Sequence, residues 1–241
     1  SGRHHQPLHR AHQALELDPN HPATLRAYAS LSERLGEWEE AYDHRARLID
    51  LLGDDERFEA LMLQARLCRM SIADPYRAVD ALTEARRILP EDPEVLRQLG
   101  ALYQDTGQNA RAIDALTDLS RVAETSTERR DVALELAKVH EAQDDLAHAI
   151  EALNVALDED PQCFPAFEKV ENLLATAGKW QLLEENYRRM IERIPKEGDR
   201  RMVRVVLWKS LGDLYRMKLK NFDGAKVAYE VVLKLKPDEP A

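Results

Sequence analysis

Helix-breaking residues recur at a nearly constant spacing along these 241 residues, and this recurrence constrains the fold more than any other feature. Successive boundaries lie 34, 37, 34, 37, 34 and 42 residues apart. The boundary residues are Pro19, Gly53, Pro90, Glu124, Pro161, Pro195 and Pro237. Proline disrupts helix interiors but suits helix starts and the positions just past helix ends. The spacing therefore predicts a repeat architecture of helices about 12–18 residues long.

Composition supports an all-α fold. Alanine and leucine together number 65, whereas valine, isoleucine and threonine number 27. The first group favours helices and the second favours strands. Hydrophobic residues make up 44% of the chain, which is enough for a packed core.

Local signals place the helix ends. Three glycines follow apolar helical segments, where a left-handed cap needs glycine: Gly36, Gly107 and Gly178. Asp74-Pro75 and Asp92-Pro93 read as an N-cap followed by the first helical residue. Thr125 and Glu128 fit a capping box.

Two recurring patterns alternate along the chain. The first is a large residue, then Leu-Gly and a tyrosine, as in Leu96-x-x-Leu99-Gly100-x-x-Tyr103-x-x-x-Gly107 and Trp208-x-x-Leu211-Gly212-x-x-Tyr215. The second is a small residue, a leucine or tyrosine four positions later, and a closing proline: Ala78/Leu82/Pro90, Ala149/Leu153/Pro161 and Ala225/Tyr229/Pro237. In this the chain resembles the tetratricopeptide repeat (TPR) family over nearly its whole length. The resemblance implies a right-handed α-solenoid of antiparallel helix pairs, the TPR superhelix.

We expect a single TPR solenoid domain over residues 1–241. Residues 7–19 read as half a repeat, and six repeats follow at about 21–53, 54–90, 91–124, 125–161, 162–195 and 196–237. The half repeat leads us to expect a fragment of a longer repeat protein. Arg45 departs from the pattern, since it occupies a position that is usually apolar.

Close helix packing requires small side chains at fixed positions. We expect this role for Ala41, Ala78, Ala112, Ala149, Ala225, Gly100 and Gly212. We expect Tyr103, Tyr215 and Trp208 to fill the gaps between helix layers.

The sequence contains no catalytic pattern. It has no glycine-rich phosphate loop, no G-x-S-x-G elbow and no H-E-x-x-H helix, so we do not expect an enzyme and assign no cofactor. Cys68 and Cys163 read as structural thiols, because the same-face neighbours of Cys68 carry no charge and Cys163 has no basic residue beside it.

Histidine is the remaining candidate for metal binding. His5, His9 and His12 would share one face of a helix, which could bind Zn²⁺ or Ni²⁺. No nearby carboxylate or cysteine completes a tetrahedral set, so we assign no metal site. His44, His140 and His148 read as isolated surface residues.

Charge is unevenly distributed. The chain carries a net charge of −10, yet residues 196–236 hold 11 Lys and Arg against 5 Asp and Glu. Five basic residues there could contact an anionic partner: Arg200, Arg201, Arg204, Lys218 and Lys220. The acidic remainder argues against nucleic-acid binding.

The resemblance implies a protein–protein interaction scaffold, because first helices in this family line a concave groove that binds a peptide or helix of a partner. By repeat phase, the groove residues are Arg26, Glu33, Leu63, Leu67, Met70, Arg97, Gln104, Leu134, Lys138, Glu168, Asn172, Lys209 and Arg216. Leu63, Leu67 and Met70 form an apolar stripe that either offers a hydrophobic anchor site or packs against a neighbouring helix.

Two other hypotheses remain at this point. The chain could be a self-assembling structural module, with weak homo-oligomers forming through uncapped ends, or a regulatory domain of a larger protein whose activity lies elsewhere. The chain has no apolar run long enough to span a membrane and no signal-peptide pattern. We therefore expect no membrane association and a cytoplasmic location, unless the N-terminus is trimmed.

Overall fold

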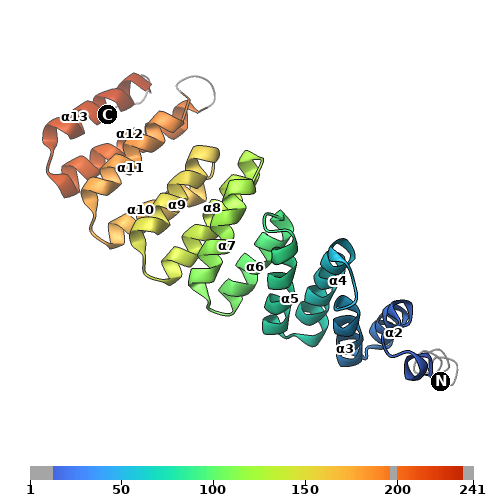
Figure 1. The fold of residues 1–241 in the computed structure, drawn as a ribbon. Helices are drawn as coiled ribbons and strands as arrows, with labels where there is room; N and C mark the ends of the chain where they lie inside the picture. The colour runs from blue at the N-terminus through green and yellow to red at the C-terminus, as the bar shows by residue number, and fades with distance from the viewer. Residues whose placement is uncertain (1–12, 196–199, 236–241) are drawn as a thin grey trace. The chain divides into compact units, whose positions relative to one another are not determined.

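The computed structural model describes residues 13–195 and 200–235, and these residues form helices without a single strand (Figure 1). The all-α class predicted from the sequence is thereby confirmed. The chain divides into two compact units, with the boundary between Val122 and Ala123. Each unit is a stack of antiparallel helix pairs, which confirms the expected solenoid fold within each unit.

The first unit contains three helix pairs, preceded by a helical segment at 13–17. The helices are α2 (Pro22–Leu35), α3 (Trp38–Ile49), α4 (Asp54–Leu67), α5 (Pro75–Ile88), α6 (Pro93–Asp105) and α7 (Asn109–Val122). Leu15 of the helical segment packs with Leu25, Tyr28 and Leu48, so this segment covers the first pair.

The second unit also contains three pairs. Its helices are α8 (Ser126–Ala142), α9 (Leu146–Glu159), α10 (Phe164–Thr176), α11 (Trp180–Arg193), α12 (Arg201–Leu214) and α13 (Phe222–Leu235). Its core is continuous through the stack and includes Leu157, Phe167, Met190 and Leu211. Each of the six predicted repeat ranges thus holds one helix pair.

The predicted helix caps are present. Asp74 Oδ1 accepts hydrogen bonds from the backbone N–H groups of Tyr76 and Arg77 at 3.0 and 3.1 Å, and Asp92 Oδ1 accepts one from Val95 at 2.9 Å. The predicted left-handed glycines are confirmed, with φ values of +78° at Gly36, +70° at Gly107 and +66° at Gly178.

The small residues let the helices of a pair approach closely. The five predicted alanines are all buried: Ala41, Ala78, Ala112, Ala149 and Ala225. A Cβ at Gly100 would lie 2.8 Å from Cδ2 of Leu116, and one at Gly212 would lie 2.7 Å from Cε1 of Tyr229. Real Cβ atoms do not come this close, so in these two pairs, α6 with α7 and α12 with α13, the second helix packs directly on a glycine of the first.

Two first helices end in a π-helical turn, at η1 (Cys68–Ile72) after α4 and at η2 (Tyr215–Leu219) after α12. Each turn ends at a left-handed residue that is not glycine, Ala73 with φ +60° and Lys220 with φ +56°. A π-turn accommodates an extra residue within a helix. Repeats two and six therefore absorb additional length without losing the antiparallel pairing of their helices.

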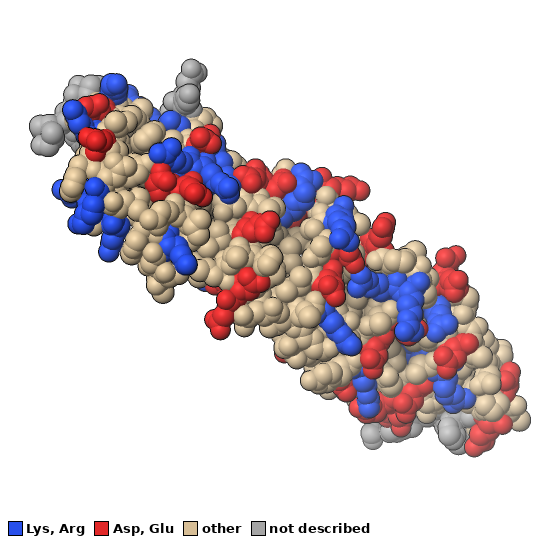
Figure 2. All heavy atoms as spheres, turned by 60° about the vertical axis from the view of Figure 1, so that its left-hand side comes forward, with Lys and Arg blue, Asp and Glu red and all other residues tan. Residues whose placement is uncertain are grey.

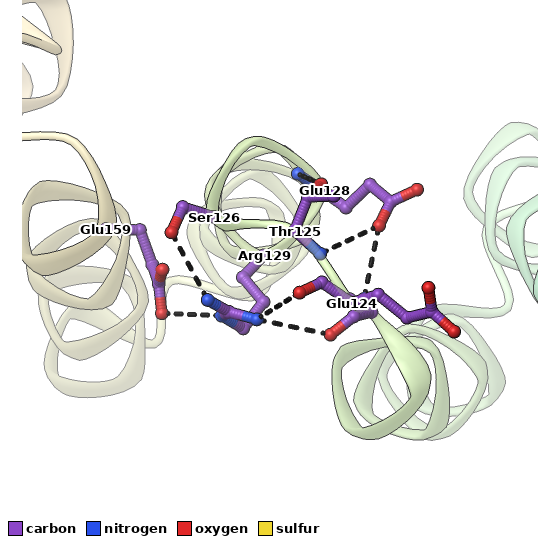
Figure 3. Close-up of polar contacts among 7 residues, drawn as sticks. Glu124, Thr125, Ser126, Glu128, Arg129 and Glu159 are labelled. Carbon is purple, nitrogen blue, oxygen red and sulfur yellow. Dashed lines mark hydrogen bonds and ion pairs between the residues drawn. The ribbon is translucent and has the colours of Figure 1, made fainter.

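Arg129 fixes the start of the second unit (Figure 3). Its guanidinium donates to the carbonyl oxygen of Glu124 at 2.9 Å and to Glu159 Oε1 on α9 at 2.8 Å. The capping box lies beside it: Glu128 N–H donates to Thr125 Oγ1 at 3.2 Å, and Thr125 N–H donates to Glu128 Oε2 at 3.1 Å. These bonds tie the first turn of α8 both to the segment before it and to α9.

Candidate functional site

Within the first unit, the first helices of repeats one and two border a cavity of about 400 Å³ whose floor is α3. The predicted groove residues Arg26, Glu33 and Leu63 all line it. The structure thus brings together residues that lie some 30 positions apart in the sequence, because α2 and α4 occupy neighbouring positions in the stack.

Five of the eleven residues that line this cavity, which we call the α2–α4 pocket, are charged. Arg45 rises from its floor, is only 8% exposed and forms an ion pair with Glu33. A second ion pair joins Arg26 to Glu56 at 3.7 Å across the pocket. The departure noted at Arg45 therefore has a structural reason: a buried guanidinium stands where other repeats place an apolar side chain, and a carboxylate compensates its charge.

The apolar stripe of Leu63, Leu67 and Met70 is divided between the two alternatives left open by the sequence. Leu63 and Met70 are exposed, at 51% and 69%, but Leu67 is 6% exposed and belongs to the core. Residues four apart on an α-helix are rotated by about 40°, and this rotation is enough to turn Leu67 from the surface into the buried stripe of α4. Met70 lies beyond α4 in the π-turn η1.

In the second unit, α10 and α12 border a cavity of about 280 Å³ with α11 as its floor. We call it the α10–α12 pocket. Its walls are mostly apolar: Phe164, Phe167, Val203, Val206 and Leu207 line it, together with Ser210. Val206 is 59% exposed, so part of the apolar wall is open to solvent. Of the predicted groove residues, Glu168 lines this pocket.

Tyr187 forms the floor of the α10–α12 pocket. Its ring meets that of Phe167 edge to face, with centroids 5.4 Å apart, and its hydroxyl donates to Glu171 Oε1. Burial and the bond to Glu171 raise the pKa of Tyr187 well above its ordinary value, so the phenol stays a proton donor. The sequence analysis missed this residue, although it stands four positions after Leu183, where other repeats have leucine or tyrosine.

The remaining predicted groove residues lie on first helices or on the turns that extend them, but line neither pocket: Arg97 and Gln104 on α6, Leu134 and Lys138 on α8, Asn172 on α10, Lys209 on α12 and Arg216 in η2. Three of them pair with acids on their own segment. Arg97 contacts Glu94 at 3.0 Å, Lys138 contacts Glu135 at 2.6 Å and Arg216 contacts Asp213 at 3.5 Å. A role for these residues in binding stays a prediction.

One of the five basic residues that were expected to contact an anionic partner is buried. Arg204 is 9% exposed and donates to the carbonyl oxygens of Ile191 and Ile194 at 2.7 and 2.9 Å. It is therefore a structural residue and cannot contact an anionic partner. Figure 2 shows acidic and basic side chains interspersed on the visible face, so no surface of a single charge is seen there.

A third cavity, of about 620 Å³, lies between α11 and α13 and has no counterpart in the sequence analysis. Trp208 and Tyr215, which were expected only to fill gaps between layers, line it together with Arg188 and Val227. Trp208 is half-buried, and its indole Nε1 has no hydrogen-bond partner among the described residues.

Two histidines that read as isolated are in fact neighbours. The rings of His140, in the last turn of α8, and His148, in the first turn of α9, stack with centroids 5.1 Å apart. Asp145 Oδ2 lies 2.7 Å from Nδ1 of His148 and 3.6 Å from Nδ1 of His140. The prediction was wrong because the tight turn between paired helices brings positions 140 and 148 together. His5, His9 and His12 lie outside the described residues.

Cys68 is a buried free thiol, and burial raises its pKa to about 11. A thiol with so high a pKa is almost wholly protonated at neutral pH, and the thiolate is the reactive form. This agrees with the structural role predicted from the sequence. None of the helices that the structure describes combines the length and apolar character needed to cross a membrane.

Comparison with known proteins supports the resemblance drawn from the sequence. Residues 207–239 match the family model described as tetratricopeptide repeat. This segment is similar to a tetratricopeptide repeat. The resemblance drawn from the sequence motifs is confirmed, and the matched segment includes most of α12 and all of α13. A search of curated proteins finds no match.

Solved structures agree on the fold. The structure of Naa15/Naa10 bound to HypK-THB matches with a TM-score of 0.59 and 17% identity, over 99% of this chain and 35% of that one. The C-terminal part of a TPR repeat-containing protein from Cytophaga hutchinsonii matches with a TM-score of 0.51 and 14% identity, over 96% and 90% of the two chains. MamA matches with a TM-score of 0.46 and 21% identity, over 76% and 96%. The first two matches, with TM-scores above 0.5, show the fold alone at these identities.

Proposed function

We propose that this chain is a protein–protein interaction scaffold that binds a peptide or helix of a partner along its first helices. The observation that carries the proposal is the α10–α12 pocket, an open cavity with apolar walls at a groove position. Exposed apolar surface at a concave site is typical of partner binding. The TPR fold supports the same function, and one structure that shares the fold is, by its title, of a protein complex. We infer a binding role without catalysis.

The chemistry of the pocket indicates the kind of partner. Its volume of about 280 Å³ suits one or two large apolar side chains. Glu168 and Glu171 stand on the α10 wall, and Glu168 is exposed. A partner segment with a leucine or aromatic anchor, flanked by lysine or arginine, would complement both features.

Selection from a random peptide library displayed on phage tests this proposal. We expect the wild-type chain to select peptides in which a large apolar residue has basic neighbours. Val206→Asp should weaken the binding of a selected peptide at least tenfold, because it places a charge on the apolar wall. Val155→Asp on α9 is the matched control, since Val155 is 45% exposed and lies away from the pocket. Equal affinity of both variants would contradict the proposal.

Self-assembly is the second candidate, favoured by the surface of α13. Three large apolar residues on this helix are exposed: Phe222, Val227 and Leu233, at 67%, 57% and 46%. A second copy of the chain could cover them. Sedimentation equilibrium over a hundredfold concentration range tests this, with Val227→Asp expected to abolish any association of the wild type; a monomer throughout would exclude it.

A further inference from the structure

The turn between α8 and α9 collects two imidazoles and a carboxylate at one point. His140, Asp145 and His148 each offer a ligand atom, and these atoms all lie within 4.8 Å of one another. All three residues belong to the hairpin of repeat four, and the turn that joins its helices holds Asp144 in the left-handed conformation, with φ +56°. The cluster is thus part of one local structure, independent of the groove.

We propose that His140, Asp145 and His148 form a binding site for a divalent transition metal ion of the Zn²⁺ class. Two imidazole nitrogens and a carboxylate oxygen are ligands that Zn²⁺ takes readily, and three protein ligands leave one position for water.

Two of the three separations between ligand atoms are close to those expected around a metal ion. With bonds of about 2.0–2.1 Å, the ligand atoms of tetrahedral Zn²⁺ lie about 3.3 Å apart. The observed separations from Asp145 Oδ2 are 2.7 Å to His148 Nδ1 and 3.6 Å to His140 Nδ1, which bracket that value. Side-chain rotations that move these atoms by a few tenths of an ångström would equalise the two separations.

The protein also orients the ligands. Asp145 is the N-cap of α9, and its Oδ1 accepts the backbone N–H of His148 at 3.3 Å. This bond fixes the carboxylate and leaves Oδ2 directed at both imidazoles.

His140 supplies the second sign of a binding site. Its side chain is 14% exposed, and Nδ1 is a buried atom without a hydrogen-bond partner among the described residues. A buried polar atom without a partner is costly. A metal ion held between Nδ1 and Asp145 Oδ2 would satisfy it, while the largely exposed ring of His148 leaves the ion a path from solvent.

Isothermal titration of the full chain with ZnCl₂ under a phosphine reductant tests the site. The protein titrated, which is also the parent of the variants below, carries glutamine in place of the histidines at positions 4, 5, 9 and 12. These N-terminal histidines therefore cannot contribute to binding. We expect one Zn²⁺ per chain and a rise in the melting temperature on its addition, because the ion would join α8 to α9.

Three variants and one control complete the experiment. His140→Asn, His148→Asn and Asp145→Asn should each weaken Zn²⁺ binding at least tenfold and abolish the rise in melting temperature; asparagine at 145 still caps α9. His21→Asn, at the N-cap of α2, should bind as the parent does. Far-UV circular dichroism verifies that each variant is folded. No binding by the parent, or undiminished binding by folded His148→Asn, would overturn the proposal.

Discussion

The α2–α4 pocket and the α10–α12 pocket occupy equivalent places in their repeats, yet their chemistry differs. Each lies between the first helices of two successive repeats, with the second helix of the earlier repeat as its floor. Arg45 on α3 and Tyr187 on α11 stand at the same repeat position. Both pair with an acid on the first helix, Arg45 with Glu33 and Tyr187 with Glu171.

The difference shows what a repeat fixes and what it leaves free. Small residues and glycines set the distance between helices and therefore the position of each pocket. The repeat does not fix which side chains line the pocket, and these vary between a set with several charges around Arg45 and a mostly apolar set around Tyr187. When a partner's apolar side chain enters an apolar pocket, the removal of water from both surfaces favours binding. When a partner enters a charged pocket, the charged groups must lose their hydration, and this opposes binding.

The largest effect should follow removal of the aromatic floor. Tyr187→Ala deletes a ring that is 4% exposed, and the resulting cavity should lower the free energy of unfolding by about 3–5 kcal/mol, as for other large core residues. Tyr187→Phe, which loses only the bond to Glu171, should cost about 1 kcal/mol. Denaturant titration followed by circular dichroism measures both; equal costs would mean that the hydroxyl, not the ring, supports the pocket.

Removal of the charged floor should cost less. Arg45→Ala leaves Glu33 without its partner, but the side chain of Glu33 is 33% exposed and can be partly hydrated. We expect a loss of about 2–3 kcal/mol, below the value for a fully buried pair. Arg66→Ala, at an exposed position on α4, is the control and should stay within about 0.5 kcal/mol of wild type. A loss no larger than that of the control would show that Arg45 is not held by Glu33.

Substitution of both Glu33 and Arg45 should make the α2–α4 pocket more like the α10–α12 pocket. In Glu33→Gln combined with Arg45→Leu, the floor receives the leucine that Leu82, Leu116 and Leu153 provide in other repeats. The double variant removes both charges together, so neither is left buried without a partner, and the partly exposed glutamine can be hydrated. We therefore expect a free energy of unfolding within about 1 kcal/mol of wild type. If the double variant loses as much stability as Arg45→Ala, the repeat position does not accept an apolar side chain here.

The smallest expected effect is a dependence of the melting temperature on pH, which arises in the second unit. The hydrogen bond from Arg129 lowers the pKa of Glu159 below its ordinary value of 4.5. Its contribution to stability is therefore present above pH 4.5 and is lost as the pH falls through the lowered pKa. Wild type should exceed Glu159→Gln in melting temperature at pH 7, and the gap should close as the pH falls below 4.5. A gap that persists in acid would show that charge is not the cause.

Features that depend on backbone geometry were predictable from the sequence. The N-cap aspartates, the left-handed glycines and the small residues are dictated by the helix ends and by the close approach of paired helices, which sequence spacing reports directly. Tyr187 stands at a regular position of the repeat, four residues after Leu183, but was not singled out from the sequence.

Features that depend on which way a side chain faces were not predictable. Leu67 lies about 40° around the helix from Leu63, and spacing alone does not locate the edge of the buried stripe. His140 and His148 come together only because the turn after α8 is tight, although histidines flanking an Asp-Asp turn could have signalled it. Arg204 bonds to carbonyl groups at the end of α11, a contact that no local pattern reports.

Methyl NMR with a phage-selected peptide tests the central claim, that the apolar pocket of the second unit takes the partner's anchor. Valine and leucine methyl groups mark both sites: Val203, Val206 and Leu207 line the α10–α12 pocket, and Leu48 and Leu63 line the α2–α4 pocket. We expect the three methyl-bearing residues of the α10–α12 pocket to shift on titration while Leu48 and Leu63 stay unchanged. Shifts at Leu48 and Leu63 with none at Val206 would contradict the account.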